Sequence, residues 1–353
     1  MLTVSLKQLE DFIHRCLASV DMPDADARTV AGLMAEADLS GSDGHGVFRL
    51  PQYVKRVKSG GINVRPNIHV ARDHGAMAVV NGDDGMGHLV MRYAADLAME
   101  KAAELGVGWV GVQHGNHAGP AALYARMPMQ KDMIGIYIAV GSANHLPPWG
   151  GTELLLSTNP IAVGVPAAEE FPIVLDMATT VAAYGKVKTA AQRGEQMPEG
   201  WMMDKLGNAL TDPTRAAEGF LLPIGGPKGY GLALIFGLLA GTLNGAAFGR
   251  EVVDFNADSR TSTNTGQLVA ALSIEAFMEV DVFKAKVDDV IRSMHASPTL
   301  PGVDAVRVPG ERSQRIRLDR QATGIPIHPG LADKLDSLAA ELGAPALAGA
   351  GQA

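Results

Sequence analysis

The fold class is decided by the stretch Gly106-Val107-Gly108-Trp109-Val110-Gly111, which has the spacing of the GxGxxG dinucleotide-binding string. Such a string holds a pyrophosphate only when a strand precedes it and the N-terminus of a helix follows it. Here a helix is predicted over residues 88–105, Gly106 stands at its C-terminal end, and a strand is predicted over 108–113. The order is reversed, so we reject a Rossmann domain. A dinucleotide, if one binds, must be held in another way.

Helical and strand-like patterns alternate over the rest of the chain, which predicts a mixed α/β fold. Apolar residues at helical spacing predict helices over 6–20, 24–40, 47–59, 88–105 and 331–343, and from about residue 230. Strands are predicted within 69–80 and over 108–113, 134–140, 161–165, 173–176 and 270–276. A chain of 353 residues exceeds the usual size of one core. We expect two domains, residues 1–115 with 295–353 returning to them, and residues 116–294.

Composition excludes several classes of protein. The net charge is −8 and the basic residues are scattered, so nucleic acid is not an expected partner. The single cysteine, Cys16, cannot form an internal disulfide, and the N-terminus lacks a signal-peptide pattern, which together favour the cytoplasm. Residues 229–249 carry no charge and are long enough to cross a membrane, but we favour a buried helix of a soluble protein because no other segment resembles a membrane span.

His45 and Arg49 are the first candidate catalytic residues. Four residues apart on one helix, their side chains would share a face, with Cβ atoms about 5–6 Å apart. The guanidinium suits a carboxylate, and the imidazole suits proton transfer to an adjacent carbonyl oxygen as hydride reaches the carbon. From this pair alone, the alternative is a helix-capping histidine beside a solvated arginine.

A second candidate segment is His114-Gly115-Asn116-His117-Ala118-Gly119-Pro120, which follows a predicted strand. Loops at strand ends gather ligand sites, so His117 is expected to contact a cofactor or to act as the acid or base. A metal site with His114 is the weaker alternative, because no third and fourth ligands stand close by in the sequence. No metal is therefore expected.

Four further motifs have ambiguous functions on their own. Pro147–Gly151 and Ser157–Pro160 are rigid turn signals that can shape a pocket wall or form ordinary loops. The run Gly225–Gly229 precedes a helix and contains Lys228, so it can hold a phosphate. Residues 307–312 add the cations Arg307 and Arg312.

Taken together, these segments resemble the malate/L-lactate dehydrogenase-like family, which also includes sulfolactate, ureidoglycolate and 2,3-diketogulonate oxidoreductases and the Δ1-piperideine-2-carboxylate reductases. The resemblance covers nearly the whole chain. It rests on these motifs, in order: His45-Gly46-Val47-x-Arg49, Asn116-His117, Pro148-Trp149-Gly150-Gly151, Thr158-Asn159-Pro160, Asp176-Met177-Ala178-Thr179, Pro227-Lys228-Gly229-Tyr230-Gly231 and Arg307-x-Pro309-Gly310-Glu311.

The resemblance implies a non-Rossmann NAD(P)-binding sheet with a helical N-terminal segment, and a homodimer. Residues 1–115 would then carry the substrate site and 116–294 the NAD or NADP site. It implies that His45 is the proton donor and that Arg49 and Thr158 bind the substrate carboxylate. Gly44, which flanks His45, would let the substrate approach closely. The implied cofactor residues are His117, Ala118, Gly119, Pro120, Ala121, Asp176, Met177, Ala178, Lys228, Arg307, Gly310, Glu311 and Arg312.

The sequence departs from the family pattern at positions that bear on the substrate. The family usually has serine before the catalytic histidine, where this chain has Gly44, and the imine-reducing branch has an aspartate where this chain has Gly185-Lys186. The catalytic lysine of the ureidoglycolate branch is also missing, because no lysine occurs between Asp132 and Gly185. A small 2-hydroxy or 2-oxo carboxylate, malate- or lactate-like, is therefore the expected substrate.

Two other functions stay open at this stage. The first is reduction of cyclic 2-imino acids, in which the same arginine holds the carboxylate and a C=N bond accepts hydride. The second is a catalytically silent NAD(P)-binding protein, because Gly44 replaces the usual serine.

Overall fold

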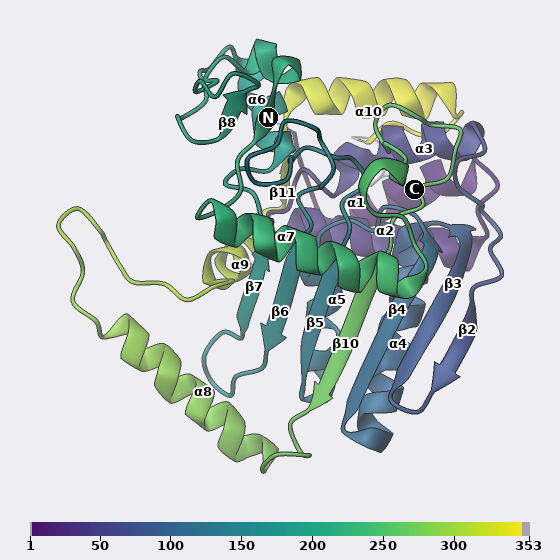
Figure 1. Ribbon diagram of the computed structural model, residues 1–353. Coiled ribbons are helices and arrows are strands. Elements are labelled where there is room, and N and C mark those ends of the chain that lie inside the picture. The colour runs from purple at the N-terminus through teal and green to yellow at the C-terminus, as the bar shows by residue number, and fades with distance from the viewer. Residues whose placement is uncertain (1, 348–353) are drawn as a thin grey trace.

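The structure, a computed structural model, describes residues 2–347 and is built around a seven-stranded sheet with helices on both faces (Figure 1). Its strands are β2 (His69–His74), β3 (Met77–Gly85), β4 (Val107–Gly115), β5 (Met133–Ala139), β6 (Ile161–Val165), β7 (Ile173–Met177) and β10 (Gln267–Ser273). They lie in the order β2-β3-β4-β10-β5-β6-β7. Only β3 and β4 pair in parallel, so the sheet differs from the parallel sheet of a Rossmann domain.

Helix α4 (Gly87–Leu105) runs directly into β4, which confirms the helix-then-strand order around the GxGxxG string. Gly106 has a φ of 83° and ends the helix, with its N–H bonded to the carbonyl of Ala102. A Cβ on Gly108 would overlap the carbonyl oxygen of Ala98 in α4. A Cβ on Gly111 would overlap the side-chain oxygen of Asn244. These glycines therefore allow a tight turn and close packing, and they do not form a phosphate loop.

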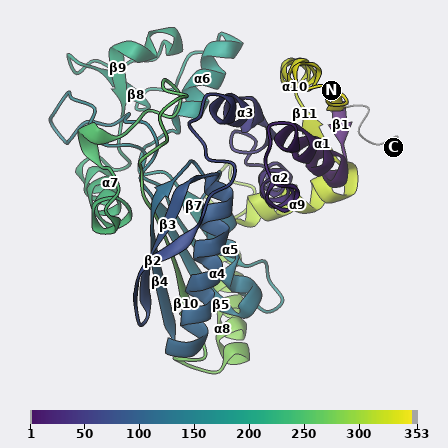
Figure 2. The ribbon, with the colours of Figure 1, turned by 90° about the vertical axis from the view of Figure 1, so that its right-hand side faces the viewer.

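The two faces of the sheet are covered by different helices. Helix α4 and α5 (Ala122–Arg126) pack on one face, and α7 (Pro227–Ala240) packs on the other (Figure 2). Side chains of β3, β4, β5 and β10 fill the α4 face, whereas Ile138, Val140 and Leu268 meet α7 on the opposite face. This two-sided burial explains the nearly continuous apolar runs in the central strands.

The helical N-terminal segment lies beside one end of the sheet (Figure 2). It contains β1 (Leu2–Val4), α1 (Leu6–Ala18), α2 (Asp24–Leu39), the 3-10 turn η1 (Val47–Arg49) and α3 (Leu50–Lys58). The C-terminal α9 (Glu311–Thr323), β11 (Ile325–Ile327) and α10 (Pro329–Glu341) join it, and β11 pairs with β1. The seven-stranded sheet contains strands from before and after residue 115. This arrangement does not test the proposed domain boundary, which stays a prediction.

The remaining elements form a small lobe and a long arm. Helix α6 (Tyr184–Arg193), β8 (Met202–Asp204), η3 (Pro213–Glu218) and β9 (Gly219–Leu221) build the lobe around their own apolar cluster. Helix α8 (Val280–His295) lies along the β7 edge (Figure 1), and the short turns η2 (Pro128–Lys131), η4 (Thr242–Asn244) and η5 (Gly249–Glu251) complete the chain. Helices α5, α6, α8 and α9 and the three-residue strands were not predicted from the sequence.

The prediction of a buried helix within residues 229–249 was wrong in part, because one face of α7 is exposed. The helix ends at Ala240, and no helix within residues 2–347 is long and apolar enough to cross a membrane. Leu232, Ile235 and Leu238 are exposed on its outer face. Its Gly237 serves packing, because a Cβ there would overlap the ring of Phe248.

Gly108→Ala tests whether the string serves packing. We expect it to lower the free energy of unfolding by roughly 1–3 kcal/mol, since the added methyl group must push α4 away from β4. The measurement is denaturant unfolding followed by circular dichroism. Gly32→Ala in α2 is the control: it has open space and is expected to stabilise by about 0.5–1 kcal/mol. A Gly108→Ala protein as stable as the wild type would contradict this account.

Candidate active site

His45 lies in a turn between α2 and η1, and a buried carboxylate fixes that turn. Asp38, near the end of α2, accepts a hydrogen bond from the Val47 N–H at 2.7 Å. A Cβ on Gly46 would overlap the same carboxylate, so only glycine allows this approach. Burial raises the pKa of Asp38 to about 8 against the lowering effect of the Val47 hydrogen bond. The Arg320 guanidinium adds hydrogen bonds to the Asp38 carbonyl and the Asp43 carboxylate.

The expected geometry of His45 and Arg49 was wrong in one respect. Helix α3 begins at Leu50, so His45 precedes the helix and the two side chains do not share a helical face. The Arg49 side chain instead folds back and donates from Nε to the Gly44 carbonyl at 3.0 Å. The pair still interacts, because Arg49 lowers the pKa of His45. The capping alternative has no support here, since no side chain caps η1.

The structure brings His45 and His117 together. Their rings are 5.8 Å apart between centroids and nearly parallel, at 10°. On its other side, His117 stacks on Phe255 at 5.1 Å. Burial, followed by the charge of Arg49, lowers the pKa of His45 to about 4, and the pKa of His117 falls well below its ordinary value mainly through burial. Both imidazoles are therefore neutral near pH 7 in the free protein.

Tyr53 and Arg56, both on α3, support this pair. The Tyr53 hydroxyl and His117 Nδ1 are hydrogen-bonded at 2.6 Å. The Arg56 guanidinium is buried, lies 4.9 Å from the Phe255 ring centroid and donates to the Phe255 carbonyl at 3.2 Å. One helix thus positions both the hydrogen-bond partner and the stacking partner of His117.

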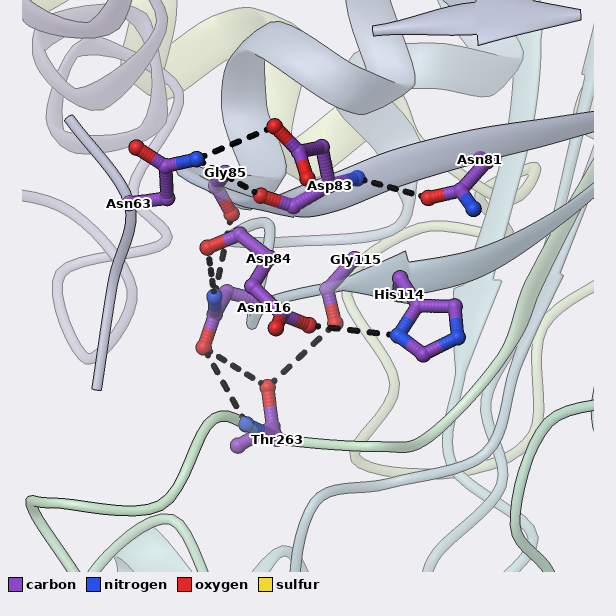
Figure 3. Close-up of polar contacts among 9 residues, drawn as sticks. All are labelled: Asn63, Asn81, Asp83, Asp84, Gly85, His114, Gly115, Asn116 and Thr263. Atoms are coloured by element: carbon purple, nitrogen blue, oxygen red, sulfur yellow. Dashed lines mark hydrogen bonds and ion pairs between the residues drawn. The ribbon is translucent and has the colours of Figure 1, made fainter. Parts of the chain in front are cut away.

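A polar network centred on buried Asn116 holds the chain just before His117 (Figure 3). Its side-chain nitrogen donates to the carbonyls of Asp84 at 2.8 Å and Gly85 at 3.0 Å. Its side-chain oxygen accepts from the Thr263 hydroxyl at 2.9 Å. The ends of β3 and β4 and the 263 loop are thereby tied together, which fixes where His117 enters the site.

His114 does not share the site with His117. It is exposed, has a φ of 53°, and its Nδ1 lies 3.3 Å from the Asp84 carboxylate (Figure 3). Within residues 2–347, no group of three or more His, Cys, Asp or Glu side chains is arranged to hold a metal ion.

Several implied cofactor residues line one cavity of about 500 Å³ between α2, α9 and the end of β7. Four residues that the family resemblance assigns to the cofactor line this cavity: Pro120, Asp176, Gly310 and Arg312. Asp176 accepts from the Ala122 N–H at 3.0 Å, which joins the 117–121 loop to β7. Gly310 has a φ of 88°, and a Cβ there would lie 2.8 Å from Val174. Tyr124 fixes the same loop by donating to the Ala118 carbonyl at 2.6 Å.

Other implied residues have different surroundings. The buried Glu311 carboxylate accepts from Arg315 and the Val308 N–H and lies 2.9 Å from the His295 ring, so its oxygens are already used. Arg307 pairs with Asp304, and Lys228 is exposed at the start of α7. The Thr158 carbonyl accepts from Thr179 beside the end of β7. Within the described chain, none of these four residues hydrogen-bonds to His45 or His117.

Four residues around the two imidazoles were not predicted from the sequence as part of the site: Asp38, Tyr53, His88 and Phe255. Tyr53 was within reach of sequence reasoning, because it continues the four-residue spacing of His45 and Arg49. His88 is fully buried in α4 with its ring 5.5 Å from that of Tyr53, and burial lowers its pKa to about 3. Asp38 and Phe255 carry no local signal, because only the tertiary contacts make them part of the site.

Comparisons with known proteins identify the family of this chain. Residues 4–336 match the family model described as malate/L-lactate dehydrogenase. L-sulfolactate dehydrogenase of Methanocaldococcus jannaschii is 38% identical over 327 residues, which cover 93% of each chain. Its solved structure aligns with a TM-score of 0.90 over 97% of this chain and 98% of that one.

Two further relatives act on other kinds of substrate. Malate dehydrogenase of Pyrococcus abyssi is 36% identical over 348 residues, 95% of this chain and 94% of the relative. The Δ1-pyrroline-2-carboxylate/Δ1-piperideine-2-carboxylate reductase of Pseudomonas putida is 32% identical over 327 residues, 92% and 93% of the two chains. The match is nearly full-length in every case, and the non-Rossmann sheet is the one shared with the solved relative. This chain belongs to the malate/L-lactate dehydrogenase family.

Proposed function

We propose that this protein is an NAD(P)-dependent oxidoreductase that interconverts a small 2-hydroxy carboxylate and its 2-oxo form. The observation that carries the proposal is the parallel pair of neutral imidazoles, His45 and His117, 5.8 Å apart beside the Arg49 guanidinium. Malate and sulfolactate dehydrogenases among the relatives support a malate- or lactate-like acid. The residue roles that follow belong to the same proposal.

Arg49 is proposed to bind the carboxylate of the substrate through paired hydrogen bonds, aided by Thr158, with the backbone at Gly44 alongside. This places the 2-oxo group against the imidazoles. Bound NAD(P)H supplies the hydride. His45 gives a proton to the carbonyl oxygen, and the incoming carboxylate favours the protonated form because it neutralises the Arg49 charge that otherwise lowers the pKa of His45.

The cofactor is proposed to lie along the 117–121 loop and the cavity beside β7. The lining fits an anionic dinucleotide, because Arg312 is exposed there and Arg126 is close by. Asp176 offers an acceptor suited to a ribose hydroxyl, while Arg312 suits a phosphate. Met177, Ala178, Ala121 and Lys228 are proposed to complete the contacts, and both NAD and NADP remain candidates.

Reduction of cyclic 2-imino acids is the second candidate function, favoured by the Pseudomonas putida relative. Two residues weigh against it. Gly44 offers no hydroxyl next to His45, and the Lys186 side chain lies 6.0 Å over the Trp201 ring in the small lobe. The serine and aspartate of a relay are therefore missing from this chain.

We also propose a cytoplasmic homodimer. Buried Cys16 has a pKa raised to about 11 by desolvation, as suits a structural thiol in a reducing compartment. The exposed side chains Leu232, Ile235, Leu238 and Leu243 form an apolar row on and just after α7 that a second copy of the chain would cover.

A substrate panel with Arg49→Ala tests the proposed function. With NADH or NADPH, we expect turnover of oxaloacetate, 3-sulfopyruvate or pyruvate above that of Δ1-piperideine-2-carboxylate. Arg49→Ala should lower kcat/KM roughly 10- to 100-fold, since a charged hydrogen bond is worth about 1.5–3 kcal/mol. Exposed Arg72→Ala is the control. No turnover of any 2-oxo acid by the wild type would overturn the proposal, and faster imine reduction would favour the second function.

His45→Gln tests the proton donor. We expect kcat to fall at least about 100-fold, the range typical for loss of a general acid, without a change in the unfolding midpoint. Exposed His74→Gln is the matched control and should keep the wild-type rate. Retention of more than a tenth of the rate in His45→Gln would exclude this role.

Arg312→Ala tests the cofactor site. We expect the Kd for the preferred reduced dinucleotide to rise roughly tenfold, because one charge-assisted contact of about 1.5 kcal/mol is lost. Titration calorimetry measures this directly for NADH and NADPH in turn. An unchanged Kd for both would place the dinucleotide elsewhere.

A further inference from the structure

The hydrogen bonds of His117 distinguish its two ring nitrogens. The Gly119 N–H points at Nδ1 at 3.4 Å, and the Tyr53 hydroxyl lies 2.6 Å from the same nitrogen. A backbone N–H can only donate, so Nδ1 must accept and carries no proton. The proton of a neutral His117 is then on Nε2.

Tyr53 reinforces this assignment. Its side chain is fully buried, and within residues 2–347 its hydroxyl has no hydrogen-bonding partner other than His117. If the hydroxyl accepted from Nδ1, its own O–H would be left buried and unpaired, which costs more than an unused lone pair. The hydroxyl therefore donates to Nδ1, as the Gly119 N–H does.

The surroundings of His117 disfavour its protonation from every side. Arg49 faces it from η1, Arg56 from α3, His45 from the preceding turn and His88 from α4. The remaining face is covered by the apolar ring of Phe255. Tyr53, which is hydrogen-bonded to His117, is acidic, but burial raises the pKa of its hydroxyl and keeps it neutral. The guanidinium charges of Arg49 and Arg56 would repel a positive charge on His117, and burial would leave that charge poorly solvated.

His45 differs from its neighbour. Its ring nitrogens make no hydrogen bond within the described chain, and its pKa is lowered by burial and by Arg49 alone among the charged groups. A bound carboxylate on Arg49 removes part of that effect. His45 can gain and lose a proton during turnover, whereas a neutral His117 could lose its proton only by becoming an imidazolate.

We propose that Tyr53 is a positioning residue that locks His117 in the neutral, Nε2-protonated form, so that His117 acts as a fixed hydrogen-bond donor to the substrate oxygen while His45 alone exchanges the proton. This rests on the proposed function. In the reductive direction the C=O π bond breaks, hydride forms the new C–H bond, and the His45 imidazolium proton forms the O–H bond. His45 ends neutral and regains a proton from water, and His117 keeps its proton throughout.

The test is the tautomer of His117, read from long-range ¹H–¹⁵N NMR spectra of protein labelled at histidine. Signals are assigned by their loss in His117→Asn. We expect a protonated Nε2, an unprotonated Nδ1, and no titration between pH 5 and 8. An Nδ1-protonated ring, or a ring that titrates within that range, would overturn the proposal. The tautomer is measured without turnover, so failure of this proposal stays distinguishable from failure of the proposed function.

Tyr53→Phe separates positioning from mere packing. We expect the His117 signals to show a mixture of tautomers, and kcat to fall roughly tenfold with KM changed less than twofold, as for loss of one neutral hydrogen bond. Buried Tyr137→Phe is the matched control and should change neither the signals nor kcat. A single Nε2-protonated form and a wild-type kcat in Tyr53→Phe would show that Tyr53 does not set the tautomer.

Discussion

The candidate active site depends on the hydrogen bonds of one buried amide, Asn116. Because β3 and β4 are the parallel pair of the sheet, their C-terminal ends meet at one edge, and Asn116 joins those ends to each other and to Thr263. An unpaired buried amide would be costly, so the three segments are held at one separation. His117 follows Asn116 directly in the chain, so this network also fixes the position of His117.

The opposite side of the site comes from a separate part of the fold. The turn that carries His45 is anchored by Asp38 and Arg320, which belong to the helical segment and not to the sheet. Helix α3 then crosses between the two parts, with Tyr53 bonded to His117 and Arg56 bonded to the loop of Phe255. The geometry of the candidate site therefore requires the helical segment and the sheet to pack in one arrangement. Small shifts between them would change the spacing of the two imidazoles.

Arg49 and His45 suit any small acid with an adjacent carbonyl, and the relatives named for malate and sulfolactate act on acids of that kind. The proposed chemistry, in which Arg49 binds the carboxylate and His45 alone delivers the proton, needs neither the serine nor the aspartate that this chain lacks.

The sequence by itself determined the fold class and the main elements, because helix and strand periods are local. It also determined that Gly106–Gly111 is no phosphate loop, since the order of helix and strand around it is read directly from the chain. Ordered motifs pointed to His45, Arg49 and His117, and the 117–121 loop does meet β7 at Asp176. The short strands and α9 were not predicted, because a three-residue strand or a mostly charged helix has too little periodicity in its apolar residues.

Only the tertiary structure decided how these residues work. In the structure His45 precedes the 3-10 turn that contains Arg49, and its ring stacks on the ring of His117. The Glu311 carboxylate already accepts hydrogen bonds from its neighbours. The structure also added Asp38, His88 and Phe255, which are distant in sequence from the groups they support. The physical reason is that pKa values and tautomers depend on burial and on partners brought together across the fold, and no local pattern in the chain encodes those contacts.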